Sequence, residues 1–219
     1  GTIPNKEWSF ATQTSAGLQQ LPRQPACLHL IDTDPESGRA SITGLHDLTE
    51  RIGIRVRGSF SSTWNPKPYS LETWDEYDAD KSTSPLGLPG ESDWILYYPH
   101  PLYDRQLIAN TFSWELSRQT GRYGTRFRLV DTFINQDGGD LTPADRVGVY
   151  AFAEKVTRDD DRIEFEPLSE DGSTGGWLLS INRMDPIPVG GFPTENGALA
   201  PQFFHTAGPD RMLQTPPNQ

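Results

Sequence analysis

The chain has 219 residues, a formal net charge of −11 and 34% hydrophobic residues. This length is enough to bury a substantial core in one domain, and the excess of acidic over basic residues, 30 against 19, disfavours nucleic acid as a partner. No apolar run reaches the roughly eighteen residues of a membrane span, so the sequence predicts no transmembrane segment. Oligomeric state stays open.

The predicted elements begin after an extended arm at residues 1–24. Short strands are expected at 26–31, at 52–57, where apolar and polar residues alternate, and at 68–74. Residues 94–98 (WILYY) suit either a buried strand or the start of a helix. The first half of the chain therefore predicts a sheet of short strands joined by turns.

Residues 103–119 give the clearest helical pattern, and Gly121 follows as a stop signal. The residues that recur at helical spacing, and that we expect to face the core, are Ile108, Phe112, Leu116 and Gln119. Glu115 falls between the apolar positions, so the pattern places a carboxylate on a buried face.

Strands are expected again after the helix, at 126–135 and 147–156, and the acidic loop between them suggests a hairpin. Shorter strands are expected at 162–165 and in the segment GGWLLSI that begins at Gly175. Residues 186–219 are rich in Pro and Gly without periodicity, which predicts an irregular tail.

The predicted class is α+β, an antiparallel sheet with one main helix on one face. The domain is expected to span residues 25–185, between the arm at 1–24 and the tail at 186–219.

One lysine is held between two prolines in the segment NPKP, since Pro66 and Pro68 both fix their backbone φ angle. A carboxylate on a buried helix face needs a cation, so Lys67 is the candidate partner of Glu115. Protein kinases hold nucleotide phosphates with a sheet lysine paired to a helix glutamate. The alternative is that both residues are ordinary surface charges.

A resemblance to a known family rests on five blocks in order. They are IRVRGSFSSTWNPKPYSLETWDE, LGLPGESDWILYY, LIANTFSWELSRQTGRYGTRFRLVDTFIN, VGVYAFAEKV and GGWLLSIN. The chain resembles the spore-coat CotH kinase family over about residues 24–185. The resemblance implies a fold like the small lobe of a protein kinase, ATP and magnesium as cofactors, phosphate transfer to proteins, and an extracellular or cell-surface location. A cytoplasmic location stays open.

Three positions match family residues that the resemblance implies in cofactor binding: Lys67, Glu115 and Glu154. Asp93 is also a family position, for which we expect a structural role as a cap or turn acceptor. Arg57 and Ser62 lie in the glycine turn, which by the same likeness approaches phosphates.

The catalytic half of a kinase is not recognisable in the sequence. Asn182 stands where the family often has Asp, and Asp185 and Asp210 lie in Pro/Gly-rich segments without a strand or helix to fix them. Catalytic residues therefore stay unassigned, and whether the chain is an enzyme stays open. The four histidines show no paired spacing, so no metal site is predicted.

Two main hypotheses follow. In the first, the chain is a non-catalytic structural or protein-binding subunit of the CotH type. In the second, it is the nucleotide-binding part of an atypical secreted kinase that transfers phosphate from ATP to proteins. Trp64 and Trp74 are the residues expected to contact the partner in the first hypothesis. A third, weaker alternative is a carbohydrate-contacting β-module, since exposed Trp and Tyr side chains suit sugar faces.

Overall fold

The computed structural model describes residues 2–3, 22–58, 60–99, 104, 106, 108–164, 166, 169 and 174–175, and the backbone of 179–182, 192–193 and 203–206. The chain divides into two compact units. One comprises Gly1–Trp8 with Gln20–Val156, and the other comprises Ser9–Gln19 with Thr157–Gln219. The first unit contains Lys67, Glu115 and Glu154, the three candidate site residues assigned from the sequence.

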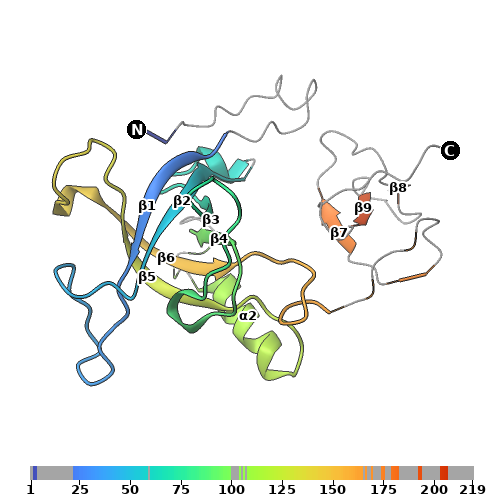
Figure 1. Cartoon of the computed structure of the whole chain (residues 1–219). Helices are drawn as coiled ribbons and strands as arrows, with labels where there is room; N and C mark the ends of the chain where they lie inside the picture. The colour runs from blue at the N-terminus through green and yellow to red at the C-terminus, as the bar shows by residue number, and fades with distance from the viewer. Residues whose placement is uncertain are drawn as a thin grey trace. The chain divides into compact units, whose positions relative to one another are not determined.

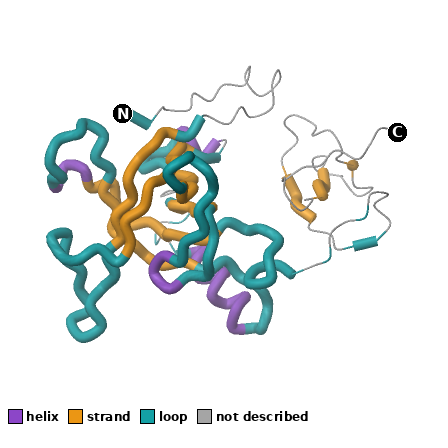
Figure 2. Tube along the Cα trace, viewed as in Figure 1, coloured by secondary structure: helices purple, strands orange, loops and turns teal. Residues whose placement is uncertain are grey.

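The first unit contains a curled antiparallel sheet of six strands in the order β1-β2-β3-β4-β6-β5 (Figures 1 and 2). The strands are Gln24–Leu30 (β1), Leu48–Val56 (β2), Tyr69–Trp74 (β3), Asp93–Tyr97 (β4), Phe127–Phe133 (β5) and Arg146–Glu154 (β6). Short 3-10 turns lie at Phe60–Thr63, Pro85–Gly87 and Pro143–Asp145. The predicted β5–β6 hairpin is confirmed, and WILYY forms a strand rather than a helix start.

The core lies on one face of this curled sheet. Alternate residues of β3 and β4 are buried, as the period of two in a strand requires. Trp94 and Phe152 are fully buried, and their rings stack with centroids 5.3 Å apart. Burial of each such side chain contributes about 1.5–3 kcal/mol, so this face supplies most of the apolar stabilisation.

The helix α2 spans Ala109–Gln119. The Asp104 carboxylate accepts hydrogen bonds from the backbone N–H groups of Ile108 (3.1 Å) and Ala109 (2.8 Å), which satisfies donors that the helix leaves free at its start. Gly121, with φ +77°, follows the last turn, so the predicted stop is confirmed. No helix in the described ranges combines the length and hydropathy that crossing a bilayer demands.

The predicted inward face of this helix is wrong. Ile108, Phe112 and Leu116 are 51%, 64% and 50% exposed, whereas Thr111 is buried. The helix contacts the sheet through Trp114, whose ring lies against Tyr97 and Phe127 at centroid distances of 5.4 and 5.8 Å.

The rings that Trp114 meets lie opposite small residues, because Tyr97 pairs with Ala151 and Phe127 pairs with Ala153. The alanines leave room for an indole between two rings. Burying the large Trp114 side chain contributes more than burying the smaller apolar side chains of the helix, so it sets the orientation of the helix.

The second unit contains a sheet in the order β7-β9-β8, with strands Leu179–Asn182 (β7), Phe192–Pro193 (β8) and Phe203–Thr206 (β9). The GGWLLSI segment thus includes a strand, as predicted. The prediction of a tail without regular elements is wrong, since β8 and β9 lie in it and β9 pairs with β7. Within 162–165, an isolated bridge joins Ile163 to Arg158, and residue 165 lies outside the described residues.

Candidate functional site

Lys67 holds its own turn together. Its ammonium group donates hydrogen bonds to the carbonyl oxygens of Ser62 (3.0 Å) and Trp64 (3.5 Å), and its own carbonyl accepts one from the Tyr150 hydroxyl (2.9 Å). Lys67 also lines a cavity of about 270 Å³ together with Arg146. The cation is therefore directed at the backbone of the turn that joins β2 to β3.

Glu115 is paired within its own helix. Its carboxylate accepts hydrogen bonds from Gln119, at 3.2 Å, and from Arg118, and these two contacts, Gln119 first, lower the pKa of the Glu115 carboxyl below its usual range. The side chain is 46% exposed. The expected ion pair with Lys67 on a buried face is therefore wrong: the helix turns this carboxylate toward Arg118, and each charge has a nearer partner.

Arg118 makes the link between helix and sheet that was expected of Glu115. Its guanidinium donates to the Thr125 carbonyl (2.7 Å) and lies 5.6 Å from the centroid of the Phe127 ring. Two of the other arginines between 118 and 128 also have partners. Arg126 forms an ion pair with Glu154, and Arg128 donates a hydrogen bond to the Leu86 carbonyl. These contacts anchor the segment that follows the helix.

Glu154 is the most deeply buried of the three predicted residues, with 0% of its side chain exposed. Its Oε1 accepts hydrogen bonds from the Tyr123 hydroxyl (3.0 Å), the Arg126 backbone N–H (2.9 Å) and the Arg126 Nε (3.0 Å), and its Oε2 is 3.0 Å from the Arg126 Nη2. The carboxylate thus fastens the segment entering β5 to the end of β6.

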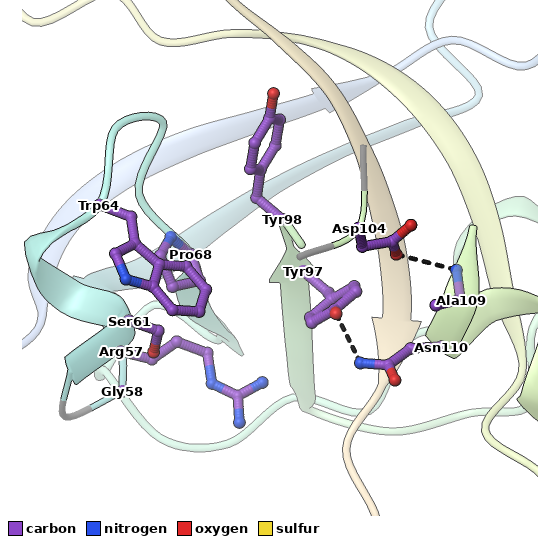
Figure 3. A pocket seen from close by; sticks show the side chains of 10 residues that line it. All are labelled: Arg57, Gly58, Ser61, Trp64, Pro68, Tyr97, Tyr98, Asp104, Ala109 and Asn110. Atoms are coloured by element: carbon purple, nitrogen blue, oxygen red, sulfur yellow. Dashed lines mark hydrogen bonds between the residues drawn. The ribbon is translucent and has the colours of Figure 1, made fainter. Parts of the chain in front are cut away.

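A second cavity, larger than the one at Lys67 and Arg146, lies beside the turn that Lys67 closes, on the side of helix α2. Its volume is about 470 Å³, and the strand end at Tyr97 and Tyr98 faces the 57–68 turn across it (Figure 3). The lining residues are Arg57, Gly58, Ser61, Trp64, Pro68, Tyr97, Tyr98, Asp104, Ala109 and Asn110. The cavity combines three aromatic side chains with one cation.

Arg57 supplies that cation, and its guanidinium points into the cavity (Figure 3). Burial lowers the pKa of the Arg57 guanidinium, and the neighbouring Tyr97 opposes this shift. Within the described ranges, its side chain has neither an ion-pair nor a hydrogen-bond partner. A desolvated guanidinium of this kind favours an anionic ligand, because its five donors suit phosphate and carboxylate oxygens.

The opposite wall of the cavity is formed by the start of helix α2. The Asn110 amide donates to the Tyr97 hydroxyl, and both Asp104 carboxylate oxygens accept from helix N–H groups (Figure 3). Asp104 is therefore committed to capping the helix. Arg57, the Tyr97 hydroxyl and the Ser61 hydroxyl are polar groups of the lining that can orient a ligand.

A charged network that the sequence did not predict crosses β3 and β4. Arg23 lies 2.8 Å from Glu72 and 3.0 Å from Asp93, and Lys155 lies 2.6 Å from the other oxygen of Asp93. Asp93 is thus an ion-pair centre rather than the expected cap. Residues so far apart in the chain gave no local signal, and only strand pairing brings them together.

The expected cofactors are ATP and magnesium, and the described residues fit the nucleotide better than the metal. Arg57 and the aromatic walls suit a nucleotide phosphate and base. The described residues include no group of three or more His, Cys, Asp or Glu side chains placed to hold a metal. Asp185 and Asp210 lie outside the described residues.

Comparison with known proteins agrees with the family resemblance. The model of the family described as CotH kinase protein matches residues 54–180, more than half of the chain. Comparisons with curated proteins and with solved structures gave no match. The matched range includes the 57–68 turn, the sheet from β3 to β6 and helix α2. The chain therefore belongs to the CotH kinase protein family.

Proposed function

We propose that this CotH-family domain is a non-catalytic structural or protein-binding subunit with a fold of the kinase small-lobe type, acting outside the cell or at its surface. The observation that supports this is the separation of Lys67 from Glu115. A kinase needs its sheet lysine held at the phosphates by the helix glutamate. Here the Lys67 ammonium bonds turn carbonyls, and Glu115 bonds Arg118 and Gln119.

A protein partner fits the outer face of helix α2. Ile108, Phe112 and Leu116 follow one another at intervals of four, and each is at least half exposed. Residues four apart lie on the same side of a helix, so the three form an apolar row. Such a row suits the apolar surface of another protein.

The experiment is a phosphate-transfer assay on the whole chain with magnesium and labelled ATP, using the protein itself and a generic acceptor protein. The proposal expects no transfer above that of a heat-denatured sample. Transfer that disappears in both Lys67→Ala and Glu115→Gln would overturn it. Unfolding curves of the two variants, compared with the unchanged protein, separate lost activity from lost folding.

A second candidate function is nucleotide binding, the part of kinase chemistry that the cavity at Arg57 favours. A guanidinium can bind a phosphate through two parallel hydrogen bonds, and Trp64, Tyr97 and Tyr98 offer ring faces for a base. The cavity of about 470 Å³ falls within the usual range for small-molecule sites. In this candidate the phosphate contact is Arg57, whereas the family likeness implies Lys67.

Calorimetric titration with ATP, with and without magnesium, distinguishes these assignments. The second candidate expects Arg57→Gln to weaken binding at least about tenfold, since a charged hydrogen bond contributes about 1.5–3 kcal/mol. Arg39→Ala, a change at an exposed arginine in another loop, is the matched control and should bind as the unchanged protein does. If Lys67→Ala weakens binding and Arg57→Gln does not, the family assignment holds. Equal binding by all variants removes both residues from the site.

A further inference from the structure

Two histidines that are distant in the sequence meet at the surface of the first unit. The Nδ1 atoms of His29 and His46 are 3.1 Å apart, although the two residues are seventeen positions apart in the chain. Their rings are 4.6 Å apart between centroids and tilted by 54°. The Thr49 hydroxyl oxygen lies 3.1 Å from the Nδ1 of His29 and 3.4 Å from that of His46. Three potential ligand atoms thus form a small triangle.

The pairing of β1 with β2 builds this triangle. His29 stands directly opposite Thr49 in the antiparallel register, near the last pair, Leu30 with Leu48. The returning chain is fixed beside them, because the Asp47 N–H donates to the Leu30 carbonyl (2.8 Å). His46 precedes Asp47 directly and is therefore placed next to His29 at the end of β1. Strands β1 and β2 lie side by side in Figure 1.

The separations suit a metal ion. Two nitrogens that each bind a zinc ion at about 2.0–2.1 Å lie about 2.9 Å apart at a right angle and about 3.4 Å apart at the tetrahedral angle. The observed nitrogen–nitrogen distance of 3.1 Å falls between these limits, and both distances to the Thr49 oxygen fall within or at the edge of them. All three side chains are exposed, so the rings can turn their lone pairs toward one point.

We propose that His29 and His46 chelate one divalent late transition-metal ion, with the Thr49 hydroxyl as a weaker third contact. Imidazole nitrogen suits Cu²⁺, Ni²⁺ and Zn²⁺, and a given nitrogen site binds Cu²⁺ most tightly of the three. The net charge of −11 favours the approach of any cation. The cluster contains two imidazoles and no carboxylate, so solvent completes the coordination of the ion.

The test is calorimetric titration of the whole, untagged chain with Cu²⁺ and with Zn²⁺. The unchanged protein should bind one ion. His29→Asn and His46→Asn should each weaken binding at least about tenfold, since even outer-sphere changes at metal sites cost about 10–100-fold in affinity. Thr49→Val should have a smaller effect. His205→Asn, at a histidine of β9, is the matched control and should change nothing.

A spectroscopic readout identifies the ligands directly. Electron paramagnetic resonance of the Cu²⁺ complex should show coupling to two nitrogens in the unchanged protein and to one in either single variant. Zinc should shift the NMR signals of the His29 and His46 imidazoles only.

Equal binding by the unchanged protein and the His29→Asn, His46→Asn double variant would overturn the proposal. So would binding that His205→Asn removes, or zinc shifts at other histidines. The wild-type spectra make the result independent of variant stability.

Discussion

Glu154→Gln tests how much the buried carboxylate at the end of β6 contributes to the fold. Glutamine has nearly the same shape, but it carries no charge and keeps one oxygen as acceptor. The glutamate side chain is 0% exposed and receives the Tyr123 hydroxyl, the Arg126 backbone N–H and the Arg126 guanidinium. The change therefore leaves a guanidinium beside a neutral amide in a place that water does not reach freely.

The magnitude follows from these contacts. Breaking a buried ion pair by removing one charge costs about 3–5 kcal/mol. The Arg126 side chain is 30% exposed, so solvent compensates part of the loss, and we expect about 3 kcal/mol, at the lower end. For a chain of this size the melting temperature should fall by about 6–12 °C, at about 2–4 °C for each kcal/mol.

Urea unfolding followed by intrinsic fluorescence and circular dichroism measures this loss. The matched control is Asp131→Asn, which removes the Arg146 pair on the same hairpin, where both side chains are about half exposed. Exposed pairs contribute about 0–1 kcal/mol, so the control should remain close to the unchanged protein. If Glu154→Gln loses no more stability than Asp131→Asn, the carboxylate does not hold the β5–β6 segment as argued.

The orientation of helix α2 and the buried tyrosines give two further predictions. Trp114→Ala should lower the unfolding free energy by about 2 kcal/mol, while Phe112→Ala, at a 64% exposed position, should change it by less than about 0.5 kcal/mol. Denaturant titration of both variants measures the two losses. If Phe112→Ala loses more stability than Trp114→Ala, the face of helix α2 that was predicted from the sequence is the one that packs on the sheet. Burial, followed by the Glu154 carboxylate, raises the pKa of Tyr123, and burial raises the pKa of Tyr150. The unfolded chain then loses these protons first, so the unfolding free energy should fall as pH rises past the usual tyrosine pKa of about 10 and be constant just below it. Ultraviolet absorbance of phenolate measures this titration, and ionisation of all seven tyrosines near that pH in the folded protein contradicts the argument.

The strands were predictable because their signals are local. In β3, side-chain alternation is itself the burial pattern, and the turn residues between β2 and β3 mark where each strand ends. The stop of helix α2 at Gly121 was predictable for the same reason. The face of helix α2 that packs on the sheet was not predictable in this way. The helical spacing of three aliphatic or aromatic residues favoured one face, whereas the contact of Trp114 with Tyr97 and Phe127 selects another.

The features of the candidate site also fall into those that follow from local sequence signals and those that depend on the tertiary structure. The sequence by itself determined the antiparallel sheet with one main helix, the family, and the rigid turn around Lys67, because each depends on neighbouring residues or on ordered motifs. Only the tertiary structure decided that Lys67 and Glu115 have separate partners, that Arg57 points into a cavity, and that His29 meets His46. A charged group or a hydrogen-bond donor pairs with the partner that is nearest in space. Strand pairing brings together residues that are far apart in the sequence, and no local sequence pattern encodes that proximity.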